Sequence, residues 1–370
     1  MIQPLFVMMD LAGGGAELSL LELLRRLDRK RIAPSLFLLR RSGVHLDRID
    51  AGIDVRFGCE AEDRLRYHLP SILIQAVRPG LRADVIVGAM EGLPTYVAWL
   101  VARLLRKPLI AWVRTDLDNH LDFLPGWHRR LARRLYPSCD AVVVPSPGAA
   151  RSLLRVVQFP PERVRTIHNP VDRSRVRALA IEDPPAALAT VLRKPYLLGI
   201  GRLNNAQKGF DSLLRAHAAV RGRGIDHRLV ILGDGKDRVA LEQLAQSLHL
   251  RDSLSMPGFQ RNPFPWLKNA RALVAPARVD GFGRVFLEAI ALGVPVIGSP
   301  ASGPAEILHD GEYGIIVHPD DIEALADAMA SMLTDDWMHA RYEQLSRERS
   351  REYSPGKPVR QWEELLCRWA

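Results

Sequence analysis

Short runs of apolar residues alternate with longer amphipathic stretches along the first half of the chain. The apolar runs, which we predict to be buried strands, lie at residues 5–9, 35–39, 85–87, 109–113 and 141–144. Leucines at helical spacing follow the first run, and helical stretches separate most of the others. Strands that alternate with helices are typical of β-α-β units, in which helices cover both faces of a parallel sheet.

A second series of the same kind follows a break in this alternation. The break passes residues 168–172 and a stretch at 183–185 that we predict to be weakly structured. Strand-like runs then return at residues 196–201, 228–232, 253–256, 272–275, 295–298 and 314–317. We therefore predict an α/β fold with two domains joined near residues 170–190, followed by an amphipathic helix at residues 359–369.

Composition and length exclude several classes of protein. The 370 residues are 47% apolar and 25% charged, which is ordinary for globular proteins and long enough for two domains. The three cysteines are far apart and form no C-x-x-C pair, which argues against a disulfide framework or a zinc cluster. No apolar run approaches the length of about 20 residues that a spanning helix needs, and no basic leader is present. We therefore expect a soluble, cytoplasmic protein that is at most peripheral on a membrane.

The net charge of +9 is concentrated in the first half of the chain. Residues 1–172 hold 25 basic and 18 acidic side chains, whereas residues 173–370 hold 26 and 24. A basic half-molecule favours an anionic partner such as nucleic acid, phospholipid or a phosphorylated ligand. We expect no nucleic-acid partner, because the chain has no zinc, ribonucleoprotein or helix-turn-helix signature.

Two segments that follow predicted strands are candidates for phosphate binding. Gly13-Gly14-Gly15 precedes the first helix, where backbone N–H groups can approach an anion; a tight turn without a ligand is the alternative. Gly201 and Arg202, with Lys208 a few residues on, follow the strand at 196–201, at the edge where open α/β sheets bind ligands. The two cations could hold a diphosphate, or they could be solvated surface charges.

Two carboxylates eight residues apart form a third candidate. Asp280 precedes a predicted helix after the strand at 272–275, and Glu288 lies in the second turn of that helix. Ionised carboxylates at this spacing can accept hydrogen bonds from separate parts of a polyhydroxylated ligand. Asp280 could instead be a helix cap, whereas Glu288 lies among apolar residues, where an unpartnered charge would be costly.

Taken together and in order, these segments resemble retaining glycosyltransferases of the GT-B fold, specifically glycosyltransferase family 4. Any one match is weak, but their order and spacing along nearly the whole chain are specific. The matching segments are Gly-Gly-Gly-Ala-Glu (13–17), His-Asn-Pro-Val-Asp (168–172), Gly-Arg-Leu with Lys-Gly (201–203 and 208–209), Gly-Asp-Gly (233–235), Asp-Gly-Phe-Gly to Leu-Glu-Ala (280–289), Gly-Val-Pro-Val (293–296), Ser-Gly-Pro-Ala-Glu-Ile (302–307) and Asp-Gly (310–311).

The resemblance implies two Rossmann-like domains that face each other across a cleft. Residues 1–172, with a helix at 356–370 crossing back to them, would form the acceptor-side domain, and residues 173–355 would bind the nucleotide-sugar donor. Arg202 and Lys208 would bind the donor diphosphate, Asp280 would meet the transferred sugar, and Glu288 would hold the ribose. The residues that the resemblance implies for donor binding are Gly14, Gly15, Gly201, Arg202, Lys208, Asp280, Gly281, Phe282, Gly283 and Glu288, with catalytic roles for Arg202, Lys208, Asp280 and Glu288.

The chain departs from the family pattern at two places. The paired-carboxylate motif of the family usually begins with Glu, and Asp280 is shorter by one methylene, which could alter the sugar preference. Members also often have a His after the middle strand of the first domain, where this chain has Arg114. Arg114 cannot act as a base. We therefore expect Glu17, Arg114 and Asp116 at the acceptor side, without a base role for Arg114.

We expect no metal site. Asp116-Leu117-Asp118 matches the D-x-D pattern of metal-dependent glycosyltransferases of the other major fold, but the two-domain pattern contradicts that fold. The histidines show no ligand spacing such as H-E-x-x-H.

The resemblance implies retaining, metal-independent transfer of a hexose or N-acetylhexosamine from a nucleotide sugar, with UDP favoured, to a surface-glycan or lipid-linked acceptor. No cofactor is expected beyond the nucleotide sugar. Basic stretches at residues 23–31 and 127–136 could be interfacial helices on an anionic membrane, or solvated helix faces. The alternative functions are a UDP-sugar epimerase of the same fold and a basic membrane-binding protein without catalysis.

Overall fold

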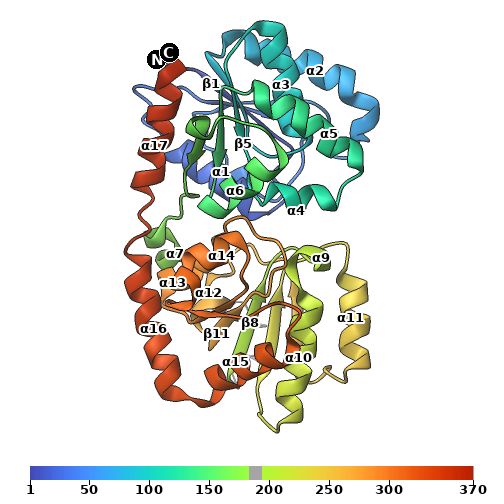
Figure 1. The fold of residues 1–370 in the computed structure, drawn as a ribbon, viewed down its shortest axis with the longest axis vertical. Coiled ribbons are helices and arrows are strands. Elements are labelled where there is room, and N and C mark those ends of the chain that lie inside the picture. The colour runs from blue at the N-terminus through green and yellow to red at the C-terminus, as the bar shows by residue number, and fades with distance from the viewer. Residues whose placement is uncertain (183–193, 370) are drawn as a thin grey trace. The chain divides into compact units, whose positions relative to one another are not determined.

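A computed structural model of the chain describes residues 1–182 and 194–369, which form two compact units (Figure 1). Unit 1 comprises Met1–Pro170 and Pro355–Ala370, and unit 2 comprises Val171–Ser354. The stretch at residues 183–185 that the sequence predicts to be weakly structured lies outside the described residues.

Unit 1 is built on a parallel sheet of seven strands in the order β3-β2-β1-β4-β5-β6-β7. All five predicted strands are confirmed, and the two edge strands, β3 and β7, are additional. Both edge strands are partly exposed and carry charged side chains, so they lack the apolar run that identifies a buried strand. The strands are β1 (Pro4–Met8), β2 (Ser35–Leu38), β3 (Asp54–Phe57), β4 (Val85–Gly88), β5 (Leu109–Trp112), β6 (Ala141–Val144) and β7 (Val164–Thr166).

Helices cover both faces of this sheet and divide the core of unit 1 into two clusters. Alternate residues of a strand point to opposite faces, so Leu5 and Val7 pack against one set of helices while Phe6 and Met8 pack against the other. The first set is α2 (Leu65–Arg82), α3 (Leu93–Leu105), α4 (Leu117–Asp122), α5 (Gly126–Leu135) and α6 (Pro147–Val156), and the second set is α1 (Gly15–Arg26) and α17 (Gly356–Leu366).

The last helix of the chain, α17, is part of the unit 1 core. It begins at Gly356, the first residue of the helix at 356–370 that the resemblance implies and three residues before the amphipathic stretch at 359–369. It gives way to a short 3-10 turn at Cys367–Trp369. Trp362 is fully buried, and its ring centroid lies 4.5 Å from that of Trp112 and 6.3 Å from that of Phe6. The end of the sequence therefore completes a core that the first strand begins.

Unit 2 repeats the architecture with a parallel sheet of six strands in the order β10-β9-β8-β11-β12-β13. The six predicted strands are all confirmed, with shifts of one or two residues at their ends. They are β8 (Tyr196–Ile200), β9 (Arg228–Leu232), β10 (Leu254–Gly258), β11 (Ala272–Val274), β12 (Val296–Gly298) and β13 (Ile315–Ile316). Two parallel Rossmann-like sheets thus confirm the predicted fold class.

The helices of unit 2 also lie on both faces of their sheet. One face is covered mainly by α7 (Arg173–Leu179), α12 (Phe264–Lys268), α13 (Arg284–Leu292) and α14 (Ser302–Ile307), and the other by α10 (Phe210–Gly222), α11 (Arg238–Ser247) and α15 (Ile322–Thr334). Unit 2 also contains, among its described residues, α9 (Asn205–Lys208), a single turn after β8, and α16 (Asp336–Ser350), which packs beside α13. None of the helices in the described part of the chain has the length and apolar character that crossing a membrane requires.

Two fully buried histidines in unit 2 form a chain of hydrogen bonds. Ile225 offers only a carbonyl oxygen to His227 Nδ1 at 3.0 Å, so that nitrogen carries the proton of the neutral ring. His227 Nε2 must then accept from His217 Nδ1 at 2.8 Å, and His217 Nε2 accepts from the Ser253 hydroxyl at 2.9 Å. Each ring is therefore held in one neutral tautomer.

This histidine chain is expected to make the stability of unit 2 depend on pH. Burial and the neighbouring His227 lower the pKa of His217 to about 3, whereas an unfolded histidine has a pKa of about 6.5. Only the unfolded state binds the proton between these values, so the contribution of His217 to the free energy of unfolding should fall as the pH drops below about 6.5. Urea unfolding at pH 7.5 and 5.0 measures this loss. His217→Gln should show a smaller loss than the native chain, and an equal loss would contradict the prediction, whereas His249→Asn, at an exposed histidine, should leave the loss unchanged.

Candidate active site

The predicted donor-site residues of unit 2 lie in loops that follow neighbouring strands. β8 and β11 are paired in parallel, so the loops after them leave the sheet at the same edge. We call residues 201–211 the lysine loop, which follows β8 and includes α9, and residues 275–283 the aspartate loop, which joins β11 to α13. Arg202 is exposed near the start of the lysine loop, and Lys208 ends α9.

The two loops are joined by an ion pair between predicted site residues. Lys208 Nζ donates to Asp280 Oδ2 at 2.7 Å, and the two side chains are only 28% and 14% exposed. The other oxygen of Asp280, Oδ1, accepts from the Phe282 backbone N–H at 3.3 Å. A cation and a carboxylate that lie in contact and partly shielded from water interact more strongly than a pair on the open surface.

The aspartate loop also packs closely against the start of α14. A Cβ atom at Gly303 would lie only 2.1 Å from the Phe282 Cα atom, so only glycine fits there. Gly303 in turn donates its backbone N–H to the Asp280 carbonyl at 3.1 Å. The phenyl ring of Phe282 is buried in the core of unit 2, so it fixes the aspartate loop to that core.

Glu288 is buried in α13, and the structure shows how its charge is balanced. Arg284, one turn earlier in the same helix, donates from Nε to Glu288 Oε1 at 2.8 Å, and both side chains are nearly buried. Sequence reasoning had not identified Arg284, although the four-residue spacing of the pair was a usable signal. The helix begins with Gly283 as its N-cap residue, in the left-handed region at φ 71°, which turns the chain from the aspartate loop into α13.

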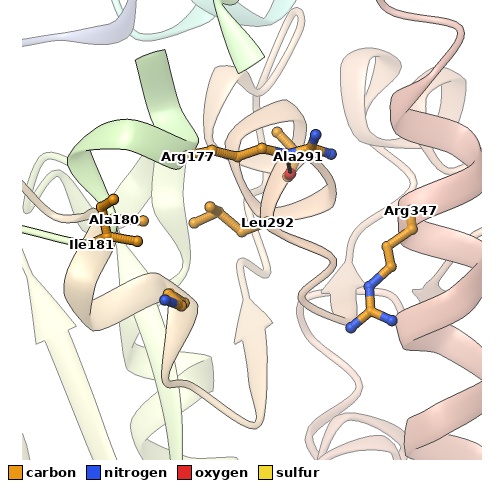
Figure 2. Close-up of a pocket in the computed structure, with 7 residues that line it drawn as sticks. Arg177, Ala180, Ile181, Ala291, Leu292 and Arg347 are labelled. Atoms are coloured by element: carbon orange, nitrogen blue, oxygen red, sulfur yellow. Dashed lines mark hydrogen bonds between the residues drawn. The ribbon is translucent and has the colours of Figure 1, made fainter. Parts of the chain in front are cut away.

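The cavity in Figure 2 lies at the opposite end of α13 and contains none of the predicted site residues. It has a volume of about 300 Å³, and Arg177 closes one side by donating from Nε to the Ala291 carbonyl at 2.9 Å. Its lining residues are Arg177, Ala180, Ile181, Lys268, Ala291, Leu292 and Arg347. The residues of the lysine and aspartate loops therefore lie outside this cavity.

In unit 1, two residues predicted to bind the donor, Gly14 and Gly15, and one predicted at the acceptor side, Glu17, lie at the start of α1. Gly14 is the N-cap residue of α1, Gly15 begins the helix, and Glu17 is buried in its first turn. Arg114 follows β5 and donates from Nη2 to the Ala16 carbonyl at 2.7 Å, while its own backbone N–H donates to Glu91 at 2.9 Å. The Arg114 guanidinium carbon also lies 3.7 Å from the centre of the Trp112 ring. Arg114 thus holds the first turn of α1, a contact that the sequence did not predict.

The D-x-D segment is divided between two local roles. Asp116 is buried and is the N-cap residue of α4. Asp118 binds the Ser152 hydroxyl and accepts from Arg155 Nε at 2.7 Å. Burial alone would raise the pKa of Asp118, but the hydrogen bonds from Ser152 and Arg155 lower it below its usual value. Within the part of the chain that the structure describes, no group of three or more His, Cys, Asp or Glu side chains is placed to hold a metal ion.

Comparison with known protein families identifies both halves of the chain. Residues 13–175 match the family model Glycosyltransferase Family 4, and residues 181–349 match Glycosyl transferases group 1. A Campylobacter jejuni protein, the N-acetylgalactosamine-N,N'-diacetylbacillosaminyl-diphospho-undecaprenol 4-alpha-N-acetylgalactosaminyltransferase, is 26% identical over 61% of this chain. The lipopolysaccharide core biosynthesis glycosyltransferase LpsE of Rhizobium meliloti is 30% identical over 56% of this chain. The matches span 60% and 57% of the length of these two relatives.

Solved structures show the same fold over almost the whole chain. Anabaena HepE in complex with UDP and glucose has a TM-score of 0.81 and 18% sequence identity, and the match covers 99% of this chain and 100% of HepE. WaaG, a glycosyltransferase involved in lipopolysaccharide biosynthesis, has a TM-score of 0.74 and 17% identity, with 97% and 98% covered. The two family models together extend from residue 13 to residue 349, interrupted only between residues 175 and 181. The chain therefore belongs to glycosyltransferase family 4, the glycosyl transferases group 1, and is a glycosyltransferase with the two Rossmann-like domains of the GT-B fold.

Proposed function

We propose that the chain is a retaining, metal-independent glycosyltransferase that transfers a hexose or an N-acetylhexosamine from a UDP-sugar to a surface-glycan or lipid-linked acceptor, as in lipopolysaccharide or exopolysaccharide assembly. The observation that carries the proposal is the contact between Lys208 and Asp280 at the carboxyl edge of the unit 2 sheet. UDP is favoured because HepE holds UDP and glucose. A lipid-linked acceptor is favoured because the Campylobacter jejuni relative is named for a diphospho-undecaprenol acceptor.

In this proposal the chain accelerates transfer chiefly by stabilising the leaving group. The bond between the anomeric carbon of the sugar and the donor phosphate oxygen breaks, the acceptor hydroxyl oxygen forms the new bond to that carbon, and the hydroxyl proton is released. Negative charge develops on the departing diphosphate, which Lys208 would bind as a point charge and Arg202 through its planar guanidinium.

The two carboxylates of the site would position the donor. When Lys208 turns to a phosphate oxygen, the Asp280 carboxylate becomes available to accept hydrogen bonds from hydroxyl groups of the transferred sugar. Glu288, held in place by Arg284, would accept from the ribose hydroxyls. Because an Arg–carboxylate pair keeps its geometry well, Glu288 can hold the nucleoside at a constant distance from Lys208.

A panel of nucleotide sugars tests this function directly. Thermal unfolding with UDP-, GDP- and ADP-sugars identifies the donor, because a ligand at 100 times its Kd adds about 2.7 kcal/mol to the free energy of unfolding. Product analysis with the donor alone then detects hydrolysis, and the same assay in EDTA tests metal independence. We expect stabilisation by a UDP-sugar and slow release of UDP with EDTA present. Binding of none of these donors would refute the proposal, and conversion of the donor to an isomeric nucleotide sugar would establish the epimerase alternative.

We also propose that unit 1 contacts an anionic membrane surface, at the cytoplasmic side, through a face formed by α2, α3 and α5 (Figure 1). The residues of these three helices, all within the described part of the chain, include no Asp or Glu. α3 packs against α2 and reaches α5 through the Tyr96 hydroxyl, which lies 3.1 Å from His128 Nδ1. Exposed apolar side chains lie beside the basic ones. They are Tyr67, Ile74, Leu81, Leu100, Leu104 and Trp127.

Of the two basic stretches predicted to contact a membrane, 23–31 and 127–136, only the second exposes an aromatic side chain together with basic ones. Helix α1 ends at Arg26, so the predicted interfacial helix at residues 23–31 is wrong as a continuous helix. Its apolar side chains, Leu23, Leu24 and Leu27, are buried in the unit 1 core and cannot enter a lipid surface. In α5, by contrast, Trp127 and Arg130 are exposed, as are Arg133 and Arg134 near its end. The membrane proposal therefore rests on α2, α3 and α5.

Removing charge and an aromatic ring from this face should weaken vesicle binding. For the variant Trp127→Ser/Arg130→Gln/Arg134→Gln we expect at least thirtyfold weaker binding to phosphatidylglycerol vesicles, since each arginine contributes about 1 kcal/mol near an anionic surface. Flotation with phosphatidylglycerol and phosphatidylcholine vesicles measures this. Trp337→Ser/Arg341→Gln is a matched control, because Arg341 lies over the exposed Trp337 ring on α16 in unit 2. Equal losses in both variants would contradict the assignment.

A further inference from the structure

Arg278 occupies a position in the aspartate loop that neither the sequence motifs nor the family comparison singles out. Its guanidinium reaches back to the start of α10, where Nη1 and Nη2 donate to the two oxygens of Asp211 at 3.0 and 3.3 Å. Nε and Nη2 donate to Asp320 Oδ1 at 3.0 and 2.8 Å. The Asp211 pair is the better shielded of the two, because Asp211 is 29% exposed and Asp320 is 59% exposed.

The contacts of Arg278 lie on both sides of Lys208 in the sequence. On one side, the Arg278 backbone N–H donates to the Gln207 carbonyl at 2.8 Å, and Nη1 donates to the Asn205 carbonyl at 3.1 Å. On the other side is the Asp211 pair. The loops also touch at Gly209, where a Cβ atom would lie 2.2 Å from the Pro276 carbonyl oxygen. The lysine loop is therefore held against the aspartate loop on both sides of Lys208, at Asn205, Gln207, Gly209 and Asp211.

Two ion pairs thus join the same two loops, and each loop supplies the cation of one pair and the anion of the other. The lysine loop supplies the cation Lys208 and the anion Asp211, and the aspartate loop supplies the anion Asp280 and the cation Arg278. In the proposed reaction Lys208 leaves Asp280 to bind phosphate, which breaks one of the pairs. The Arg278–Asp211 pair does not depend on Lys208 and keeps the loops together during that exchange.

Arg278 cannot itself bind the donor while these contacts are in place. A guanidinium has five N–H donors, and the contacts with Asn205, Asp211, Ser212 and Asp320 provide an acceptor for each of them. Burial alone would lower the pKa of Arg278, but the hydrogen bonds that it donates to Asp211 and Asp320 raise it, so the charge is retained. Any effect of Arg278 on the reaction must therefore pass through the residues that it holds.

We propose that Arg278 is a positioning residue that fixes the lysine loop, so that Lys208 can exchange Asp280 for a donor phosphate without movement of its backbone. The proposal rests on the proposed function for its consequence in the reaction, but not for the loop contact itself. It predicts that loss of the guanidinium weakens recognition of the diphosphate group and leaves recognition of the nucleoside intact.

Hydrogen exchange of the unliganded protein tests the loop contact without any donor. In Arg278→Gln four amides that are bonded within the lysine loop should exchange about tenfold faster than in the native chain. They are the amides of Gln207, Lys208, Gly209 and Asp211. Arg278→Lys should be intermediate, because lysine cannot bind both oxygens of Asp211 through a planar fork. Arg223→Gln is the matched control, since Arg223 also pairs with two carboxylates, Glu323 and Asp327. Native exchange rates in Arg278→Gln would overturn the proposal.

Calorimetry with UDP and with uridine then distinguishes a displaced Lys208 from a general loss of structure in the binding site. We expect Arg278→Gln to bind UDP about tenfold more weakly than the native chain, with uridine affinity unchanged and with Arg223→Gln like the native chain. Equal weakening of UDP and uridine would show a collapsed pocket and overturn the assignment to Lys208. If the native chain binds neither UDP, GDP nor ADP, the proposed function fails, while the exchange experiment still decides whether Arg278 holds the loop.

Discussion

Replacing Lys208 by alanine is expected to lower kcat/KM for glycosyl transfer by roughly 10²–10³-fold, the usual cost of removing one group that stabilises a developing negative charge. The ammonium group lies at the carboxyl edge of the unit 2 sheet, 2.7 Å from Asp280 and 28% exposed. Charge that builds up on a departing diphosphate would be met there by a cation already in place. Initial rates over a range of donor concentrations measure the effect.

Lys194→Ala provides the matched control for Lys208→Ala. Lys194 Nζ forms an ion pair with Asp226 at 2.6 Å, which resembles the Lys208–Asp280 pair in length but is more exposed. If the positive charge of Lys208 at the carboxyl ends of the unit 2 strands is what lowers the barrier, Lys194→Ala should keep native kinetics. Its free energy of unfolding should change by at most about 1 kcal/mol. Comparable rates for Lys208→Ala and Lys194→Ala would remove Lys208 from the proposed mechanism. Asp280→Asn should retain part of the activity, because Lys208 would still be present to bind phosphate.

Trp362→Ala should destabilise unit 1 by about 3–5 kcal/mol, the usual cost of truncating a fully buried tryptophan. The side chain fills the space between α17 and the sheet, against Trp112 and Phe6. The cavity left by alanine would be lined by large rings on separate strands, which cannot easily close over it. Urea unfolding followed by far-UV circular dichroism measures the change.

The control for this variant is a tryptophan on the surface. Trp337 on α16 is 70% exposed, so Trp337→Ala should change the free energy of unfolding by less than about 1 kcal/mol. Because Trp362 belongs to unit 1 and Trp337 to unit 2, hydrogen exchange of β1 and β8 peptides shows which unit is affected. Native stability of Trp362→Ala would mean that α17 does not contribute to the unit 1 core.

The predicted strands and the observed strands differ at the sheet edges for a physical reason. The central strands are covered on both faces, so they read as continuous apolar runs such as residues 85–87 and 141–144. The edge strands β3 and β7 have one side open to water and contain Asp54, Arg56 and Arg165. Their place in the sheet depends on backbone pairing with β2 and β6, which leaves no hydrophobic signature in the sequence.

The site shows a similar division. The spacing of Asp280 and Glu288 is visible in the sequence. Because Glu288 lies among apolar residues, its charge was expected to have a partner, and the structure identifies that partner as Arg284. The partner of Asp280 is 72 residues away in the chain, and no local pattern predicts such a contact. Arg114 occupies the position where the family often has a histidine, and in the structure it donates to the Ala16 carbonyl in the first turn of α1.

By itself the sequence determined the two α/β units, the buried central strands and the segments that follow them, because hydrophobic periodicity and glycine placement are local properties of the chain. Only the tertiary structure decided which side chains meet. The parallel pairing of β8 with β11 brings the lysine and aspartate loops to one edge, and Arg278 then reaches Asp211 across 67 residues. Packing of Trp362 onto Trp112 likewise required the complete fold. Charge pairs and core contacts between distant segments depend on chain topology, which residue periodicity does not encode.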